Sequence, residues 1–354
     1  MKKKAWIFLI TFLFIISVFA TYLLYNNKPT YPDLTLVVLS SEDISAGSLA
    51  AGAEMFSQKY GCKVEFTNSA EECDLIYSSG EDFSLCQPID EYINPKNKLY
   101  TEQIIRESCT QDGKIYGITN VLLGNLNYGV YYPEQFENIT SPYDYYKRGD
   151  WTWDNFINMV DELDSNISVD WTKSYINMKN ALIFESDGST LFDYNTQEQI
   201  EWLNFVRTLI FDKEIVDSSE GAFKIGFLPE TLLNEISVGS DVRYIPWPTK
   251  NGKMGDMFVD EYHFCVPKTA KNPKLSVKLA NYMIKSCRDT RLNLYRSSMT
   301  KDDFEILQKQ LDKIYTYPKH TDYVPAQIFI DDFIHGKTVT EHIYNVENDA
   351  DHIK

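Results

Sequence analysis

The first part of the chain alternates between short apolar runs and one amphipathic segment. The run LTLVVLS, residues 34–40, is continuous and rich in β-branched side chains, which is typical of a buried parallel strand. Residues 49–60 place apolar side chains at helical spacing before Gly61, and two more strand-like runs follow at residues 63–67 and 73–79. This order of strand, helix and strand predicts an α/β lobe in which helices cover a parallel sheet.

Polar residues follow two of these predicted strands. In such sheets ligands bind beyond the carboxyl ends of the strands, which here read SSED at residues 40–43 and SSGED at residues 78–82. Loops are polar in most proteins, so the composition of these ends is a weak signal. The candidate ligand contacts at these ends are Ser41, Glu42, Ser79 and Asp82.

Two later stretches have the pattern of strands that pass between lobes. Residues 112–136 begin with an Asp-Gly turn and continue as a long stretch with few charges. The segment EYHFCVPK, residues 261–268, alternates like a strand and ends at Pro267. Helical spacing returns at residues 196–215, and again from Asn272-Pro273 to residue 287.

The stretch GDWTWDNF, residues 149–156, has the pattern of a helix start. Thr152 is the predicted N-cap and Trp153 the first helical residue. Trp151 then lies one position before the cap, and Phe156 lies at the fourth helical position, which is the spacing of a hydrophobic staple. Both indoles are therefore predicted to be structural rather than ligand platforms.

Charge narrows the range of partners. The chain has 354 residues, which is more than a single compact core usually contains. Its formal net charge is −17. Through its long-range field this acidic excess disfavours nucleic acid, other polyanions and anionic membrane surfaces as partners.

The N-terminus is predicted to go to a membrane. Three lysines precede Ala5–Leu24, an uncharged and mostly apolar run of twenty residues that reaches about 30 Å as a helix. A retained anchor and a signal peptide cleaved near Ala20 both remain open. Either one places the chain from Asn26 onward outside the cytoplasm.

The cysteines, the histidines and the sequence motifs give little support for catalysis or metal binding. Six cysteines permit disulfides in an exported chain, but buried thiols are an equal alternative, and no pairing is predicted. The chain contains no G-x-S-x-G, H-E-x-x-H, P-loop or G-x-G-x-x-G motif, and most of its five histidines lie in the tail. We predict neither a cofactor nor a metal site. The cysteines are Cys62, Cys73, Cys86, Cys109, Cys265 and Cys287.

Five weak motifs in a fixed order make the chain resemble extracellular solute-binding protein family 1, which contains the sugar-binding receptors of ABC importers. They correspond to a "dGK.YG.P" element, a "YN" strand, a "TW.eF" helix start, a Pro-rich "P.P" segment and a "KNP" helix start. In this chain they stand at residues 112–117, 131–132, 152–156, 246–248 and 271–273. The departures are Thr119 for the family's proline, Tyr132 for its asparagine, and the absence of a lipid-attached cysteine after the apolar run.

The resemblance implies a two-lobed, periplasmic-binding-protein-like α/β fold of type II, with an interlobe cleft and an N-terminal signal or membrane helix. Residues 1–30 would be that helix and its tether, 31–122 with 267–300 the first lobe, and 123–266 with 301–354 the hinge strands and second lobe. Such a protein closes by hinge motion on a small solute, most simply a carbohydrate, without performing catalysis. It would act as a monomer and deliver the solute to an ABC permease.

Sugar recognition requires flat aromatic faces beside polar side chains. Trp247 is the favoured stacking residue, because a proline-framed loop offers no helix or strand against which to bury an indole. The other candidates lie near the predicted crossings: Asn120, Asn125, Asn127, Tyr128, Glu261 and Tyr262.

Two alternatives to a transport receptor remain. One is a membrane-anchored sensory or partner-binding protein on the same fold, in which the retained helix is essential. The other is a secreted glycoside hydrolase, although 51 acidic residues make any carboxylate pair uninformative without geometry.

Overall fold

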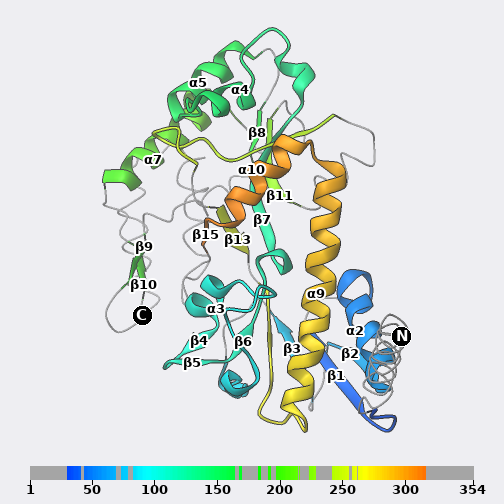
Figure 1. Cartoon of the computed structure of the whole chain (residues 1–354). Helices are drawn as coiled ribbons and strands as arrows, with labels where there is room; N and C mark the ends of the chain where they lie inside the picture. The colour runs from blue at the N-terminus through cyan, green and yellow to red at the C-terminus, as the bar shows by residue number, and fades with distance from the viewer. Residues whose placement is uncertain are drawn as a thin grey trace, which may run out of the picture.

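The computed structural model contains two lobes, each built around its own β-sheet (Figure 1). The residues that it describes are 30–40, 44–68, 73–78, 83–163, 167–169, 182–184, 190–192, 197–213, 215, 223–228, 241–254, 257–260 and 262–315. The apolar segment at residues 5–24 lies outside them. None of the helices in the described part is both long and apolar enough to cross a membrane.

The first lobe has a five-stranded sheet in the order β2-β1-β3-β14-β6. β1 is parallel to β2 and β3, as the sequence pattern predicts, whereas β14 is antiparallel to both of its neighbours. The strands are β1 (Thr35–Ser40), β2 (Lys63–Thr67), β3 (Leu75–Ser78), β6 (Gly117–Ile118) and β14 (His263–Cys265).

Two helices cover this sheet, and they cross at a glycine. α2 (Gly47–Tyr60) packs against α9 (Pro273–Ser298), and a Cβ on Gly52 would lie 2.6 Å from the Cα of Met283. Only glycine permits this approach. The smaller elements of the lobe are η1 (Phe83–Leu85), η2 (Asp90–Tyr92), α3 (Glu102–Ser108) and the hairpin of β4 (Thr110–Gln111) with β5 (Lys114–Ile115).

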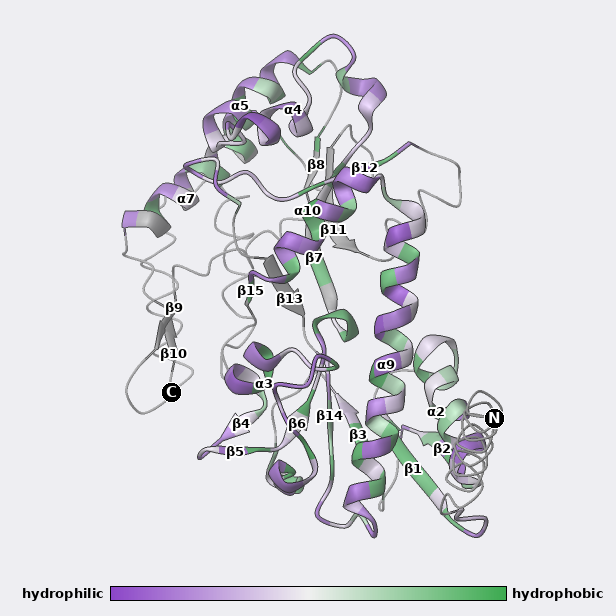
Figure 2. Cartoon of the chain, viewed as in Figure 1, coloured by the Kyte–Doolittle hydropathy of each residue, from purple (hydrophilic) through white to green (hydrophobic). Residues whose placement is uncertain are grey.

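The second lobe is organised around β7 (Asn125–Tyr131), the strand that enters it from the first lobe. Its sheet has the order β15-β13-β7-β11-β8, and β12 shares an edge of β7 with β13. Figure 2 shows β1 and much of β7 as apolar, whereas polar and apolar residues mix along α9 and α10, as expected for helices that cover buried sheets. The other strands are β8 (Ile167–Val169), β11 (Phe223–Leu228), β12 (Arg243–Ile245), β13 (Met257–Asp260) and β15 (Ile314–Tyr315).

Helices lie above, to the left and in front of this second sheet in the view of Figure 1, and a small hairpin lies at the lower left. The helices are α4 (Pro142–Arg148), α5 (Trp153–Glu162), α7 (Gln197–Arg207) with the π-helical turn η7 (Thr208–Asp212), and α10 (Lys301–Leu311). The hairpin joins β9 (Leu182–Phe184) to β10 (Thr190–Phe192), and η4 (Pro133–Phe136) follows β7.

The second passage of the chain between the lobes ends before β14, which is earlier than the predicted boundary at residue 267. The strand pairs with β3 and β6 of the first lobe, so the chain returns to that lobe by residue 263. An alternating segment does not reveal which sheet it joins, because either sheet would bury one of its faces.

All six cysteines lie in the described part of the chain, are buried, and are thiols rather than disulfides. Of the two alternatives left open by the sequence, buried thiols agree with the structure. Two of these cysteines explain why the "YG" motif has glycine at residue 117. A Cβ there would lie 3.1 Å from Cys109 Sγ and 3.4 Å from Cys265 Sγ.

Candidate functional site

The carboxyl ends of two first-lobe strands meet at the edge nearest the second lobe. Ser40, the last residue of β1, pairs in register with Tyr77, and β3 ends at Ser78. β14 follows directly from the second crossing, and its first residue, His263, pairs with Ser78. The predicted contacts Ser41, Glu42, Ser79, Asp82 and Glu261 continue from these ends but lie outside the described residues.

Tyr262 places a partly exposed aromatic side chain at this edge. Its ring is half-buried and stacks on the buried ring of Tyr77, with centroids 5.3 Å apart and planes 14° from parallel. The ring therefore has a fixed backing within the first lobe, which suits an aromatic platform.

Thr119 joins the two crossing segments. Its hydroxyl donates a hydrogen bond to the carbonyl oxygen of Tyr262, and its side chain is fully buried. Thr119 stands where the resembled family has proline, and proline has no hydroxyl to make this bond. The departure from the motif thus supplies a connection between the crossings.

Asn120 uses its amide within the protein. Its Nδ2 donates to the Leu99 carbonyl at 2.8 Å, and its Oδ1 accepts from the backbone N–H of Leu122 at 3.0 Å. Asn120 is therefore the N-cap of η3 (Val121–Leu123), with 6% of its surface exposed. The predicted role of Asn120 as a ligand contact stays a prediction.

The two crossing strands are paired on the second-lobe side as well. Leu126 pairs with Val259 and Asn125 with Asp260, so β7 and β13 leave the hinge side by side. Asn125, Asn127 and Tyr128 lie within β7, and Tyr128 pairs with Gly226 of β11. Their side chains lie outside what the structure describes, so their predicted contacts stay predictions.

Arg291 fixes the start of the first crossing, a role that no sequence motif reveals. Its Nη1 donates to the Leu122 carbonyl at 2.8 Å and to the Gly124 carbonyl. Because Arg291 belongs to α9, the long helix that extends along both lobes (Figure 1), the guanidinium ties the hinge backbone to that helix.

Two indoles hold the proline-rich segment of the second lobe. Trp151 Nε1 donates to the Pro246 carbonyl at 2.7 Å, and Trp153 Nε1 donates to the Pro248 carbonyl at 3.2 Å. The Thr249 N–H donates to the Trp151 carbonyl at 3.2 Å. The residues before and after Trp247 are thus both held by hydrogen bonds from indoles.

The helix start at GDWTWDNF is confirmed in each local feature. The Thr152 hydroxyl accepts from the Asn155 N–H at the beginning of α5, and Trp151 is 2% exposed. Its ring contacts Phe156 edge to face at a centroid distance of 5.6 Å, as a hydrophobic staple requires. Both indoles have the structural contacts that the sequence predicts.

The argument that Trp247 has no element to pack against is wrong. Its half-buried ring lies edge to face with Phe156 of α5, at a centroid distance of 6.1 Å. A proline-framed loop can therefore bury an indole on a neighbouring helix. Its Nε1 is buried and has no hydrogen-bond partner among the described residues.

A buried ion pair fixes the strand that leads to this segment. Arg243 of β12 donates to both carboxylate oxygens of Asp303 at 2.8 and 2.9 Å, and Asp303 is fully buried. This bidentate bond raises the pKa of Arg243 above its usual value. Burial raises the pKa of the neighbouring Tyr131 to about 12, so its phenol stays protonated at neutral pH.

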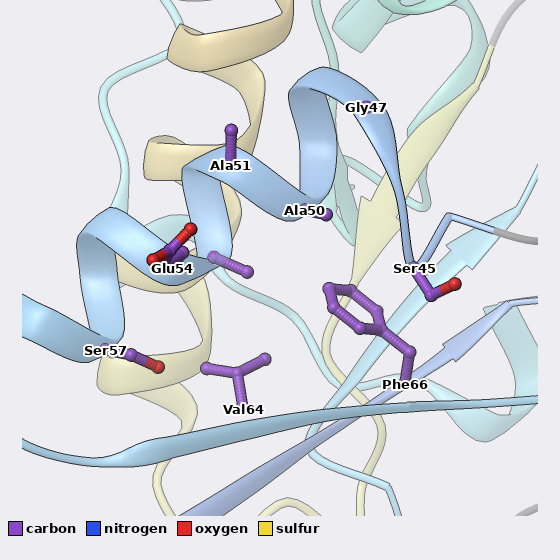
Figure 3. A pocket seen from close by; sticks show the side chains of 9 residues that line it. Ser45, Gly47, Ala50, Ala51, Glu54, Ser57, Val64 and Phe66 are labelled. Carbon is purple, nitrogen blue, oxygen red and sulfur yellow. The ribbon is translucent and has the colours of Figure 1, made fainter.

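Two of the surface hollows lined by described residues contain no predicted site residue. One, of about 440 Å³, lies between α2 and β2, where Val64 and Phe66 face Ala50, Glu54 and Ser57 (Figure 3). The other, of about 350 Å³, lies between α4 and α10. Among the described residues, no three His, Cys, Asp or Glu side chains are grouped to hold a metal ion.

Solved structures show the class of fold to which this architecture belongs. It is the two-lobed fold of ABC substrate-binding proteins that bind sugars. No family model and no curated protein sequence matches the chain.

Two of these structures illustrate the extent of the likeness. The maltose–maltodextrin binding protein of Alicyclobacillus acidocaldarius is 14% identical with a TM-score of 0.66, over 89% of this chain and 99% of that one. An ABC substrate-binding protein of Listeria monocytogenes, solved with cycloalternan, is 13% identical with a TM-score of 0.68, over 91% and 98%. At this identity the likeness establishes the fold, and the predicted two-lobed architecture is confirmed.

Proposed function

We propose that this chain is an extracytoplasmic solute-binding protein that captures a carbohydrate between its lobes and delivers it to an ABC permease. The observation that carries the proposal is the junction itself: paired crossing strands, strand ends and a stacked tyrosine at one edge. The same fold occurs in proteins solved with maltotetraose, cycloalternan and maltose.

The lobes would close by bending at the crossings, near residues 119–124 and 261–262. The Thr119 bond to Tyr262 keeps the two crossings together, so both would bend as one hinge. Binding would involve no chemical step, because capture and release need only a difference in ligand contacts between the open and closed forms.

The proposed ligand contacts come from both sides of the junction. Tyr262 would stack on the C–H face of a sugar ring from the first lobe. Trp247 would offer its buried Nε1 as a donor if closure moves a ligand oxygen into reach. The strand-end residues named above and the Asn and Tyr residues of β7 would bind sugar hydroxyls.

A thermal-shift and calorimetric panel tests this function. The panel should contain linear and cyclic gluco-oligosaccharides, manno-oligosaccharides, monosaccharides and short peptides. A ligand at one hundred times its Kd stabilises the bound form by about 2.7 kcal/mol, enough to raise Tm by a few degrees. Sugar turnover during the assay would support a hydrolase instead, and a complete absence of shifts would contradict the proposal.

We further propose that the N-terminal segment holds the protein, as a monomer, at the outer face of the cell membrane. The lysines followed by the apolar run at residues 5–24 support this location. Intact mass of the protein purified from membranes is the test. A mass that includes residues 1–24 supports an anchor, and a mass matching cleavage after Ala20 supports secretion.

A further inference from the structure

The described chain begins at the end of the first lobe that lies away from the second lobe. The Tyr31 N–H donates to the Tyr60 carbonyl at 2.8 Å. A Cβ on Gly61 would lie 3.4 Å from the Cβ of Thr30, so Thr30 lies beside the end of α2. β1 then runs from Thr35 to Ser40, whose end lies at the lobe junction. The N-terminal segment therefore joins the first lobe at the opposite end of its sheet.

Lysine and tyrosine side chains gather where the chain enters, on the adjoining ends of α2 and α9. Lys59 Nζ lies 4.9 Å from the ring centroid of Tyr282 and 5.5 Å from that of Tyr60. Lys278 Nζ lies 5.7 Å from the Tyr60 centroid, and Lys274 precedes Lys278 by one helical turn. We call these five residues the tether surface.

The tether surface is locally basic in an acidic protein. The chain has a net charge of −17, yet Lys274 and Lys278 form no ion pair with any described residue. Two exposed carboxylates, Asp33 beside Tyr31 in the sequence and Glu54 on α2, form no ion pair with a described residue.

Two ion pairs border the tether surface and contribute little net charge. Lys63 is neutralised by Glu65, and Lys285 by Asp289. Because salt screens exposed charges that lie more than about 10 Å apart, the charge of this surface can differ in sign from the net charge of the whole protein.

The short tether limits how far this surface can move from a membrane. Five residues lie between Leu24, the end of the apolar run, and Thr30, which makes six residue-to-residue steps. At no more than about 3.5 Å per residue, they span at most about 20 Å. If the apolar run is retained in the bilayer, Thr30 stays within that distance of the lipid headgroups, and the tether surface adjoins it through the Tyr31–Tyr60 hydrogen bond.

We propose that the tether surface rests on anionic lipid headgroups and sets the orientation of the anchored protein. This inference rests on the proposed membrane anchor and not on the identity of the sugar. Lysines would contact lipid phosphates, and the tyrosine rings suit the boundary between water and lipid. The strand ends at the lobe junction would then point away from the bilayer, which leaves them accessible to solutes.

Lysine footprinting of the full chain in nanodiscs tests the proposal. Amine acetylation of each lysine is followed by mass spectrometry in phosphatidylglycerol and in phosphatidylcholine discs. Lys274 and Lys278 should react several-fold more slowly in the anionic discs, and 0.5 M salt should remove the difference. Lys96 and Lys114 are exposed elsewhere on the same lobe and should react equally in both lipids.

A double variant, K59Q/K278Q, should weaken docking about 25-fold at low salt, because each lysine near an anionic surface contributes about fivefold. Acetylation of Lys274 should then return to its rate in zwitterionic discs. The matched variant K96Q/K114Q should leave the protection of Lys274 intact, and Tm measurements verify that both variants fold.

Three results would overturn the inference: equal protection in both lipids, equal loss in the matched variant, or an intact mass lacking residues 1–20. Sugar affinity is measured separately on the same samples. Protection without sugar binding would leave this inference standing while contradicting the proposed function.

Discussion

Tyr262, at the lobe junction, and Trp247, in the second lobe, are both aromatic candidates, but they are held in different ways. Tyr262 precedes a strand that is paired on both sides, its carbonyl accepts from Thr119, and its ring lies on Tyr77. Trp247 lies in a segment of the second lobe that depends on indole donors from Trp151 and Trp153. Tyr262 has strand pairing on both sides beside its side-chain contacts, whereas the Trp247 segment has two indole donors and one backbone hydrogen bond from Thr249 to Trp151.

This difference predicts how each position responds to mutation. A ladder of backbone hydrogen bonds survives most single substitutions, because every side chain still carries the same peptide groups. A segment held by two indoles loses an anchor with each one. Substitutions around Trp247 should therefore affect stability more than those around Tyr262.

The largest effect is expected for Trp151→Ala. The change removes a 2% exposed indole together with its hydrogen bond to Pro246, and should lower the free energy of unfolding by about 3–5 kcal/mol. Chemical denaturation measures the loss, and ligand affinity of the folded fraction should change less. A normal Tm with abolished binding would show instead that the indole is a ligand contact.

Asp303→Asn should be the next most damaging change. It leaves the Arg243 guanidinium without its buried carboxylate partner and should cost about 3 kcal/mol, since the side chain of Arg243 is itself only 20% exposed. Glu305→Gln is a matched control on the same helix, because Glu305 and Lys301 form an exposed pair at 3.9 Å. The control should change stability by less than about 0.5 kcal/mol, and equal losses would contradict the assignment.

The sequence predicts most local elements correctly, because β-branched runs and helical spacing are local signals. The strands at β1 to β3, the helix start at Trp153 and the helix start after Asn272 all follow from such signals. The order of five motifs also predicts the two-lobed fold, although each motif alone is weak.

What the sequence misses depends on contacts between distant residues. The Thr119 hydroxyl reaches a carbonyl 143 positions later, and Arg291 reaches the Leu122 carbonyl 169 positions earlier. Asn120 has the residue type of a sugar ligand, yet its amide caps a helical turn. Only the fold shows which polar groups are already satisfied.

Thr119→Val tests the support of Tyr262 with a smaller expected effect. Valine keeps the shape of threonine but removes the donor to the Tyr262 carbonyl, which should cost about 1–2 kcal/mol. Thr119→Ser retains a hydroxyl and should recover part of that loss. If valine and serine variants have the same Tm, the hydrogen bond contributes nothing measurable and the crossings are held by strand pairing alone.

Tyr262→Ala should have the smallest effect on stability and the clearest effect on binding. The ring is half-buried and its strand remains paired, so the loss of unfolding free energy should be about 1 kcal/mol. Loss of an aromatic platform should weaken binding of the sugar identified in the panel about tenfold, as measured by calorimetry. Tyr262→Phe, which keeps the ring, is the matched control and should bind nearly as well as the unaltered protein. If alanine binds equally well but Trp247→Ala does not, the stacking face belongs to the second lobe, and the strand-supported tyrosine only completes the core.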